Sequence, residues 1–144
     1  MDLRKLKDTE VNEALELVWK VFLKHEASDY AKEGVEEFKS ILENKEFIAK
    51  LVLYGAFDNN KIVGVLAMRK PQHISLFFVD ENYHKKGIGR SLFELMKQDY
   101  EEKEFTVNSS PYAVEVYKHL GFVPTSSEKT TNGIRYTPMK YGEN

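Results

Sequence analysis

The chain has 144 residues, the length of one compact domain (1–144), and 42% of them are hydrophobic, which is enough for one core. Its 21 Lys and Arg against 23 Asp and Glu give a formal net charge of −2, which argues against a general nucleic-acid binder. The lack of cysteine excludes disulfides, a thiol nucleophile and a cysteine-based zinc site, and the sequence contains no other metal-binding pattern.

The first part of the chain predicts a short strand followed by two helices. Asp8 or Thr9 is a typical helix N-cap, and apolar residues at helical spacing over Val11–Phe22 predict a first helix. This helix is expected to end near residues 24–26, before a polar loop at His25–Gly34. The apolar positions of a second, shorter helix are Val35, Phe38 and Leu42.

A hairpin and a buried strand are expected next. Glu46–Phe57 contains a continuous apolar run, and Ile62–Met68 predicts the strand that returns from it. The turn between them is Asp58–Lys61, where asparagines tolerate left-handed backbone angles. After Pro71, the apolar sequence of His73–Val79 predicts a central strand.

The second half of the chain alternates loops, helices and strands. A polar loop covers Asp80–Lys86, and Gly87 and Gly89 open a helix with an apolar face. Gly121 stands at the left-handed C-cap of the next helix. The later elements are the strand Glu104–Val107, the helix Pro111–Leu120 and the strands Phe122–Thr125 and Ile134–Tyr141, joined around Asn132-Gly133. This order predicts an α/β domain with a mixed sheet of about seven strands, flanked by four helices.

The junction Ser75–Leu92 is the most informative segment, because an apolar strand leads there into a helix opened by glycines. The first N–H groups of a helix have no partner inside the helix and carry partial positive charge. Glycine lets an anion approach the backbone, and Lys85, Lys86 and Arg90 add positive charge. These features predict a phosphate or diphosphate site.

Two common nucleotide-binding patterns fit this junction poorly. The sequence has no Walker pattern, and Leu92 stands where a Rossmann motif has its third glycine. The alternative to an anion site is a glycine-opened helix flanked by solvated lysines.

Residues 77–92 resemble the central motif of the GNAT (GCN5-related) N-acetyltransferase superfamily, which is a strand, a loop and the pattern Gln/Arg-x-x-Gly-x-Gly/Ala at a helix start. His84 stands where this pattern has Gln or Arg. Thr106–Phe122 resembles a second signature, an Asn-containing loop and a helix that ends in Tyr-x-x-x-Gly-Phe, and Gly133–Met139 resembles the last strand of the family. The resemblance covers roughly Lys61–Tyr141 and implies the mostly antiparallel sheet of the acyl-CoA N-acyltransferase fold.

The resemblance also implies acetyl-CoA as the cofactor. Its extended pantetheine arm would pair with the splayed strand at Phe77, Phe78 and Val79, as an added strand does. Asn108 would bind the same region, unless it is a turn or helix-capping residue, and Ala113 would leave room for the arm. The residues expected to bind the diphosphate are His84, Lys85, Lys86, Gly87, Ile88, Gly89, Arg90 and Ser91.

The implied activity is N-acetylation of a primary amine by direct attack. Tyr117 is the candidate general acid, because a phenol with an ordinary pKa near ~10 stays protonated at neutral pH and can donate to the leaving thiolate. The alternative for this residue is a core aromatic role. The N–H of Val79 is the candidate donor to the thioester carbonyl oxygen. A base or a water chain must deprotonate the amine, and the candidate bases are His73, Glu46, Glu26 and Asp29.

The acceptor is expected beside the loop between the first two helices, where Glu26, Asp29 and Tyr30 are the candidate binding residues. Acidic side chains there suit the cationic amine of a small molecule or a peptide. The alternative is a solvated, charged loop. The resemblance also allows a homodimer that pairs through sheet edges or the last strands.

Two further functions stay open. A non-catalytic acyl-CoA-binding or sensing module would use the same fold, since a fold does not by itself establish an activity. A nucleotide-binding regulator would use the Gly87-Ile88-Gly89 site.

Neither a membrane span nor a secretory signal is expected. The longest apolar stretches are far below the ~20 residues that cross a bilayer. Met1–Lys7 lacks the apolar run of a signal peptide. We therefore expect a cytoplasmic protein that binds neither membranes nor nucleic acid.

Overall fold

The computed structural model describes residues 1–142. The helices of this part of the chain are α1 (Val11–His25), α2 (Lys32–Glu43), α3 (Lys45–Ala49), α4 (Ile88–Lys97) and α5 (Val114–Leu120). The strands are β1 (Asp2–Lys5), β2 (Val52–Asp58), β3 (Lys61–Arg69), β4 (His73–Val79), β5 (Glu104–Ser109), β6 (Val123–Pro124), β7 (Lys129–Thr131) and β8 (Ile134–Gly142). Short 3-10 turns lie at Asp8–Glu10, Ala27–Asp29 and Glu81–Tyr83.

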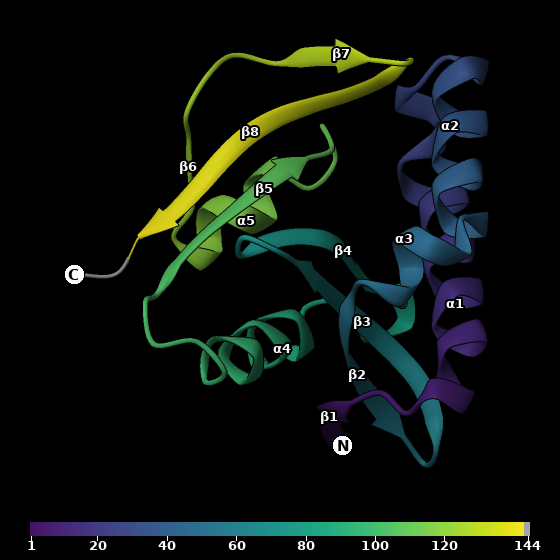
Figure 1. Ribbon diagram of the computed structural model, residues 1–144, viewed down its shortest axis with the longest axis vertical. Helices are drawn as coiled ribbons and strands as arrows, with labels where there is room; N and C mark the ends of the chain where they lie inside the picture. The colour runs from purple at the N-terminus through teal and green to yellow at the C-terminus, as the bar shows by residue number, and fades with distance from the viewer. Residues whose placement is uncertain (143–144) are drawn as a thin grey trace.

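The strands form a sheet in the order β1-β2-β3-β4-β5-β8-β6, with β7 as a further partner of β8. Neighbouring strands are antiparallel except for β4 and β5, which are parallel. Figure 1 shows α1, α2 and α3 together on one side of β2–β4, α4 on the opposite side and α5 beside β5. The expected fold, a mixed and mostly antiparallel sheet flanked by helices, is thus confirmed.

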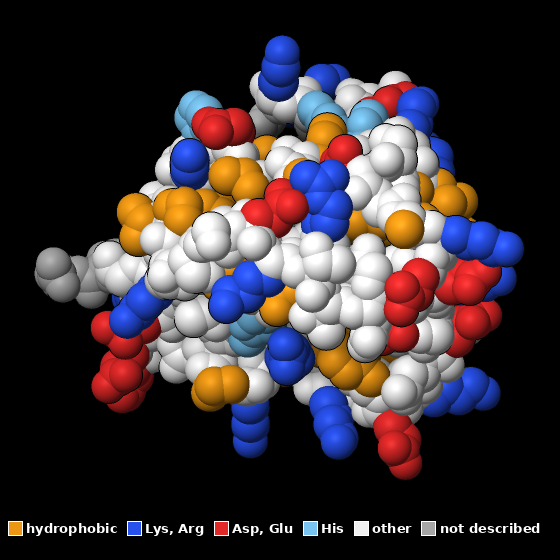
Figure 2. Space-filling model, turned by 90° about the horizontal axis from the view of Figure 1, so that it is seen from above, with side chains coloured by type: hydrophobic (Ala, Val, Ile, Leu, Met, Phe, Trp, Pro, Cys, Tyr) orange, Lys and Arg blue, Asp and Glu red, His pale blue; other side chains and the backbone are white. Residues whose placement is uncertain are grey.

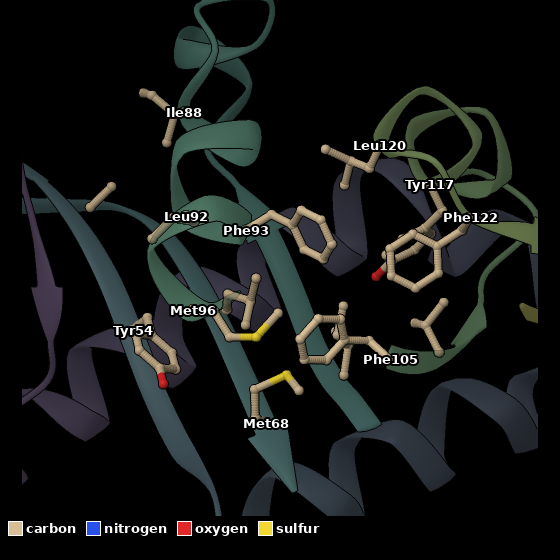
Figure 3. Close-up of a cluster of buried hydrophobic side chains, with 14 of the residues drawn as sticks. Tyr54, Met68, Ile88, Leu92, Phe93, Met96, Phe105, Tyr117, Leu120 and Phe122 are labelled. Atoms are coloured by element: carbon tan, nitrogen blue, oxygen red, sulfur yellow. The ribbon is translucent and has the colours of Figure 1, made fainter. Parts of the chain in front are cut away.

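Two hydrophobic clusters hold the helices against the sheet. On one face, Leu92 and Phe93 of α4 are fully buried among side chains of the strands and α5 (Figure 3). On the other face, Val18 and Phe22 of α1 are buried against β3 and β4. Complete burial of one such side chain stabilises the fold by about 2 kcal/mol. The apolar stripe of each helix therefore decides which side of that helix meets the sheet.

The strand expected at Glu46–Phe57 is wrong over its first part. Lys45–Ala49 form α3, and the Asn44 side chain caps this helix by accepting a hydrogen bond from the Phe47 N–H over 3.1 Å. β2 begins only at Val52. A short apolar run fits a strand and a buried helix equally well, and here the cap favours the helix.

Three other boundaries differ from the expectation. α1 begins at Val11, after a separate 3-10 turn at Asp8–Glu10. The expected loop His25–Gly34 contains a 3-10 turn and the first residues of α2. α5 begins at Val114 rather than at Pro111. The first two differences add short helical structure where the sequence has few apolar residues to signal it, and the third shortens a helix.

The hairpin expected around Asn132-Gly133 is present, but its first strand is β7. Thr131 pairs there with Ile134, whereas β6 pairs with β8 farther along, beginning at Val123. The two short strands therefore share β8 as their partner.

The surface carries both signs of charge. Figure 2, seen from above Figure 1, shows Lys and Arg side chains interspersed with Asp and Glu side chains over the face that contains the tip of β7 and β8. Within residues 1–142, no helix has both the length and the apolar composition needed to cross a bilayer.

Candidate active site

β4 and β5 begin side by side and then diverge. Their parallel pairing is confined to His73 and Ile74, the first two residues of β4, although both strands continue beyond this point. Along its other edge, β4 has an extra residue, Ser75, so that its register against β3 shifts between Ile74 and Leu76. Such a bulge bends a strand and increases its twist. The bulge at Ser75 therefore accounts for the opening between β4 and β5.

The divergence leaves backbone groups of β4 facing this opening. The Asp80 N–H donates to the Val63 carbonyl of β3 over 2.8 Å. Because hydrogen-bonded and non-hydrogen-bonded residues alternate along an antiparallel pair, the N–H and C=O groups of Phe77 and Val79 point away from β3. An extended ligand could bond to them as an added strand does.

His84 lies at the end of the opening. Its Nε2 is 2.7 Å from the Val79 carbonyl oxygen, and because a carbonyl only accepts, Nε2 carries the proton. The ring of His25 lies 5.5 Å from the ring of His84 and 5.2 Å from the ring of Tyr112, between centroids. The end of α1, the loop after β4 and the turn before α5 therefore meet here.

The loop between β4 and α4 has the backbone of an anion site. Gly87 caps α4 with a φ of +78°, and a Cβ built on it would meet no atom within 4 Å. The backbone is therefore bare beside the first-turn N–H groups of α4, which have no partner inside the helix. Lys85 and Lys86 are exposed next to it. Arg90 instead donates to the His119 carbonyl oxygen over 2.7 Å, at the end of α5.

The other residues expected at the diphosphate have different surroundings. The Ile88 side chain is buried in the core, so only its backbone is available to a ligand. A Cβ built on Gly89 would lie 3.6 Å from the Phe77 ring, an ordinary contact. The Ser91 N–H donates to the Gly87 carbonyl over 3.0 Å and closes the first turn of α4.

β5 and α5 form the opposite wall of the opening. Asn108 and Ala113 line it. The Ser110 hydroxyl oxygen accepts a hydrogen bond from the Ala113 N–H over 3.2 Å, which forms a turn before α5. Tyr117 is buried on α5, and its ring meets the Phe77 ring edge-on with centroids 5.9 Å apart. Phe77 of β4 and Tyr117 of α5 thus approach each other across the opening.

A cavity of about 320 Å³ lies between these walls and extends to α1, α2 and α3; we call it the catalytic cavity. Its aromatic lining residues are Phe22, Tyr30, Phe38, Phe47, Phe77, Phe78 and Tyr117. Its polar lining residues are Glu26, Arg69, His73, Ser75, Asn108 and Ser110. One space therefore joins the strand expected to hold pantetheine to the loop expected to hold the acceptor.

Glu26 has the environment of a general base. It follows α1 and is 8% exposed. Burial raises the pKa of its carboxyl group to about 7, although a hydrogen bond with the Ser110 side chain opposes the shift, and nearby Asp29 adds to it. A carboxyl group with this pKa exchanges a proton near neutral pH.

The other candidate bases are less suited. Burial, and then the charge of Arg69, lower the pKa of His73 to about 4, so its ring is neutral but a weak base. Glu46 is exposed on α3 and does not line the catalytic cavity. Asp29 does not line it either, and its carbonyl oxygen accepts a hydrogen bond from Arg135 over 3.1 Å. Among the four candidates, the geometry favours Glu26.

Tyr117 is a protonated phenol in this setting. Burial raises its pKa well above the ordinary value, and the charge of Glu26 raises it further. Within the described part of the chain, no hydrogen bond of its hydroxyl group is found. The hydroxyl proton is therefore available to a ligand in the catalytic cavity.

The wall formed by the segment between α1 and α2 is held in place by the β7–β8 hairpin. Tyr30 lines the catalytic cavity and stacks on Phe22, with ring centroids 5.6 Å apart. At Gly34, the third residue of α2, an added Cβ would lie only 2.2 Å from the Gly133 carbonyl oxygen. The hairpin tip thus packs directly on the backbone of α2, as Figure 1 also shows.

Three polar residues of the catalytic cavity, Arg69, Ser75 and Ser110, have no place in the sequence-based expectations. Ser110 is the hydrogen-bond partner of Glu26. Ser75 is the bulged residue of β4, and its Oγ is buried. A serine inside a largely apolar strand is the one signal that could have pointed to Ser75, and nothing local signals the contact of Ser110 with Glu26.

Comparison with known proteins gives a family match for most of the chain. A family model described as an acetyltransferase (GNAT) domain matches residues 26–142. No curated protein matches the sequence.

Solved structures of low sequence identity have the same fold. The chain is similar to a GCN5-related N-acetyltransferase from Rhodopseudomonas palustris, with a TM-score of 0.84, 20% identity and coverage of 99% of this chain and 95% of that one. It is also similar to the PaiA N-acetyltransferase from Thermoplasma acidophilum in complex with coenzyme A, with a TM-score of 0.77, 18% identity and coverage of 99% and 98%. For an aminoglycoside 6'-N-acetyltransferase complexed with coenzyme A, the TM-score is 0.68, the identity 12% and the coverage 99% and 97%.

Proposed function

Since the chain belongs to the acetyltransferase (GNAT) domain family, we propose that it transfers the acetyl group of acetyl-CoA to a primary amine by direct attack of the amine. The observation that carries this proposal is the catalytic cavity itself, which holds a buried carboxyl group, Glu26, and a buried phenol, Tyr117, where β4 and β5 diverge. These two groups supply the proton acceptor and the proton donor that amine acetylation needs.

The residues present fit acetyl-CoA, which supplies an activated acetyl thioester when bound. The bare backbone at Gly87 and the first-turn N–H groups of α4 suit its diphosphate, with Lys85 and Lys86 beside them. The C=O of Phe77 and the N–H of Val79 suit an extended amide arm, whereas the Val79 carbonyl already accepts from His84. Asn108 and Ala113 line the same opening from the other wall, where they would contact the arm.

Glu26 takes a proton from the ammonium group of the acceptor, since its pKa of about 7 leaves a large ionised fraction at neutral pH. Of the N–H groups of Phe77 and Val79, that of Phe77 lies farther along β4 from the diphosphate loop and is the candidate donor to the thioester carbonyl oxygen. The Tyr117 hydroxyl donates its proton to the leaving sulfur. Tyr30 contributes an aromatic wall for the body of the acceptor.

The test is amine-dependent thiol release from acetyl-CoA over a panel of primary amines, together with the Kd of CoA. We expect CoA binding and thiol release with at least one class of amine. CoA binding without amine-dependent release for any amine would support a non-catalytic acyl-CoA-binding module instead. Displacement of CoA by ATP or NAD would support a nucleotide-binding regulator.

A further inference from the structure

A second and larger cavity adjoins the catalytic cavity. Its volume is about 850 Å³, and it lies where α3 meets the turn between β3 and β4. Phe47 and Arg69 line both cavities, so the two spaces share a wall. The apolar residues of the second cavity include Leu51, Pro71 and Tyr100.

The charge of the second cavity is positive. Lys50, Arg69 and Lys70 line it, and its lining contains no Asp or Glu. None of these three side chains has an ion pair with another residue in the range 1–142. The charge of Arg69 also reaches the catalytic cavity, because it contributes to the lowered pKa of His73. A carboxylate at this wall would therefore meet a cation that no protein carboxylate neutralises.

The catalytic cavity has a polar atom that lacks a partner. The Ser75 Oγ is buried and has no hydrogen-bond partner among the described residues. It lies in the bulge of β4, and Ser75, His73 and Arg69 all line the catalytic cavity. Buried hydroxyl groups are normally hydrogen-bonded, so this atom is an independent indication of a polar ligand group near the shared wall.

We propose that the shared wall binds a carboxylate of the acceptor, so that the acceptor is a small primary amine with a carboxylate at its other end. This inference rests on the proposed acetyl transfer. The amine lies at Glu26, and the carboxylate lies at Arg69, with Lys50 and Lys70 behind it. The aromatic residues that line the same cavity suit a hydrocarbon or aromatic body.

The two charged ends fix the direction in which the acceptor binds. The carboxyl group of Glu26 attracts the ammonium group and repels the carboxylate, and Arg69 does the opposite. The planar guanidinium group of Arg69 can bind a carboxylate through two parallel hydrogen bonds, which a lysine cannot do. Arg69 is therefore the residue on which selectivity for an acidic acceptor depends.

The kinetic test uses ω-aminocarboxylates from aminobutyrate to aminooctanoate, each compared with its primary amide. For at least one chain length, we expect kcat/KM of the acid to exceed that of the amide by about tenfold or more. Arg69→Gln should bring this ratio close to one, whereas Lys39→Gln on the exposed face of α2 should preserve it. Equal kcat/KM for acids and amides in the wild type, or an unchanged ratio in Arg69→Gln, would overturn the proposal.

A binding measurement separates this proposal from the proposed function. Aminohexanoate and its amide are titrated calorimetrically into the CoA complexes of the wild type and of Arg69→Gln. We expect the acid to bind the wild type more tightly than the amide, and its Kd to rise about tenfold in the variant. If no amine is acetylated while CoA binds, the acetyltransferase proposal fails, and this titration still decides about the carboxylate site. Equal affinity of the wild type for the acid and the amide, or binding of neither, would overturn that site.

Discussion

The carboxyl group of Glu26, at the end of α1, is hydrogen-bonded to the side chain of Ser110, in the turn between β5 and α5. The same Ser110 hydroxyl oxygen accepts the Ala113 N–H that shapes this turn. The position of the proposed base therefore depends on the turn that also places α5, and with it Tyr117. The contact of Glu26 with Ser110 thus connects the acceptor wall of the cavity to the wall that carries the proposed acid.

Replacement of Glu26 by glutamine should remove the base without a change of shape. We expect kcat/KM to fall by about 100-fold, the usual size of a general-base contribution. In the wild type, the pH profile of kcat/KM should rise through an inflection near pH 7, where the Glu26 carboxyl group loses its proton. Glu26→Gln should lack this inflection, and Glu33→Gln on the exposed start of α2 should keep it. An inflection that persists in Glu26→Gln would assign it to another group.

The raised pKa of Glu26 also makes a prediction about stability. The carboxyl group has a pKa of about 7 in the folded chain against an ordinary value of 4.5, so the folded state binds more protons between these values. The stability that the neutral Glu26 carboxyl group contributes is complete at pH values below its pKa in the unfolded chain. This stability is lost as the pH rises through its pKa in the folded chain. The full loss is about 3 kcal/mol.

Chemical denaturation of the wild type and Glu26→Gln from about pH 4 to about pH 8 measures this loss. The variant should gain stability relative to the wild type as the pH rises. A stability difference that stays constant over this range would mean that the carboxyl group is not held in its neutral form.

Replacement of Tyr117 by phenylalanine keeps the ring contacts with Phe77 and removes the proposed proton donor. We expect turnover to fall by about 100-fold, with the Kd of CoA unchanged. Tyr54→Phe, at a buried tyrosine that packs in the same hydrophobic cluster as α4 and lines neither cavity, serves as the control and should retain turnover. Turnover of Tyr117→Phe within about twofold of the wild type would rule out the acid role.

Two neighbouring glycines of the α4 loop should respond differently to alanine. Gly87 has a φ of +78°, so an alanine there is strained by about 1–2 kcal/mol although no atom blocks its Cβ. The strain should shift the loop and weaken CoA binding. Gly89 lies inside α4, where alanine is favoured by up to about 1 kcal/mol, and its Cβ would make an ordinary contact with Phe77.

Thermal melting and CoA titration of both alanine variants check this difference. Gly87→Ala should have the lower Tm and the higher Kd for CoA. If Gly87→Ala leaves the Kd for CoA unchanged, the diphosphate does not lie on this loop.

The contact between Gly34 and Gly133 should matter for the acceptor and not for CoA. Helix propensity alone predicts that Gly34→Ala stabilises α2 by up to about 1 kcal/mol. The added Cβ would lie 2.2 Å from the Gly133 carbonyl oxygen, so the hairpin must move instead. We expect a lower Tm, a raised KM for the amine and an unchanged Kd for CoA. Ser40→Ala on the exposed side of α2 is the control. An unchanged KM for the amine in Gly34→Ala would mean that the β7–β8 hairpin does not position the acceptor site.

Features that depend on neighbouring residues could be predicted from the sequence. Gly87 and Gly121 adopt positive φ values of 78° and 110° at helix ends, conformations that glycine adopts at little cost. The central strand His73–Val79 and its loop to α4 follow from a continuous apolar run and the glycines after it.

Features that depend on distant residues could not be predicted in the same way. Nothing in the sequence distinguishes Glu26 from the other candidate bases, His73, Glu46 and Asp29. Glu26 becomes buried beside Ser110, which comes from a distant part of the chain. The bulge at Ser75 is a matter of register between β3 and β4, which the apolar pattern of one strand does not encode.

The most direct test of the account is a crystal structure of the wild-type protein with CoA. We expect the diphosphate on the backbone of residues 84–91, the pantetheine amides bonded to β4 at Phe77 and Val79, and the sulfur in the cavity between Glu26 and Tyr117. CoA bound elsewhere, or bound with its sulfur outside this cavity, would contradict the account.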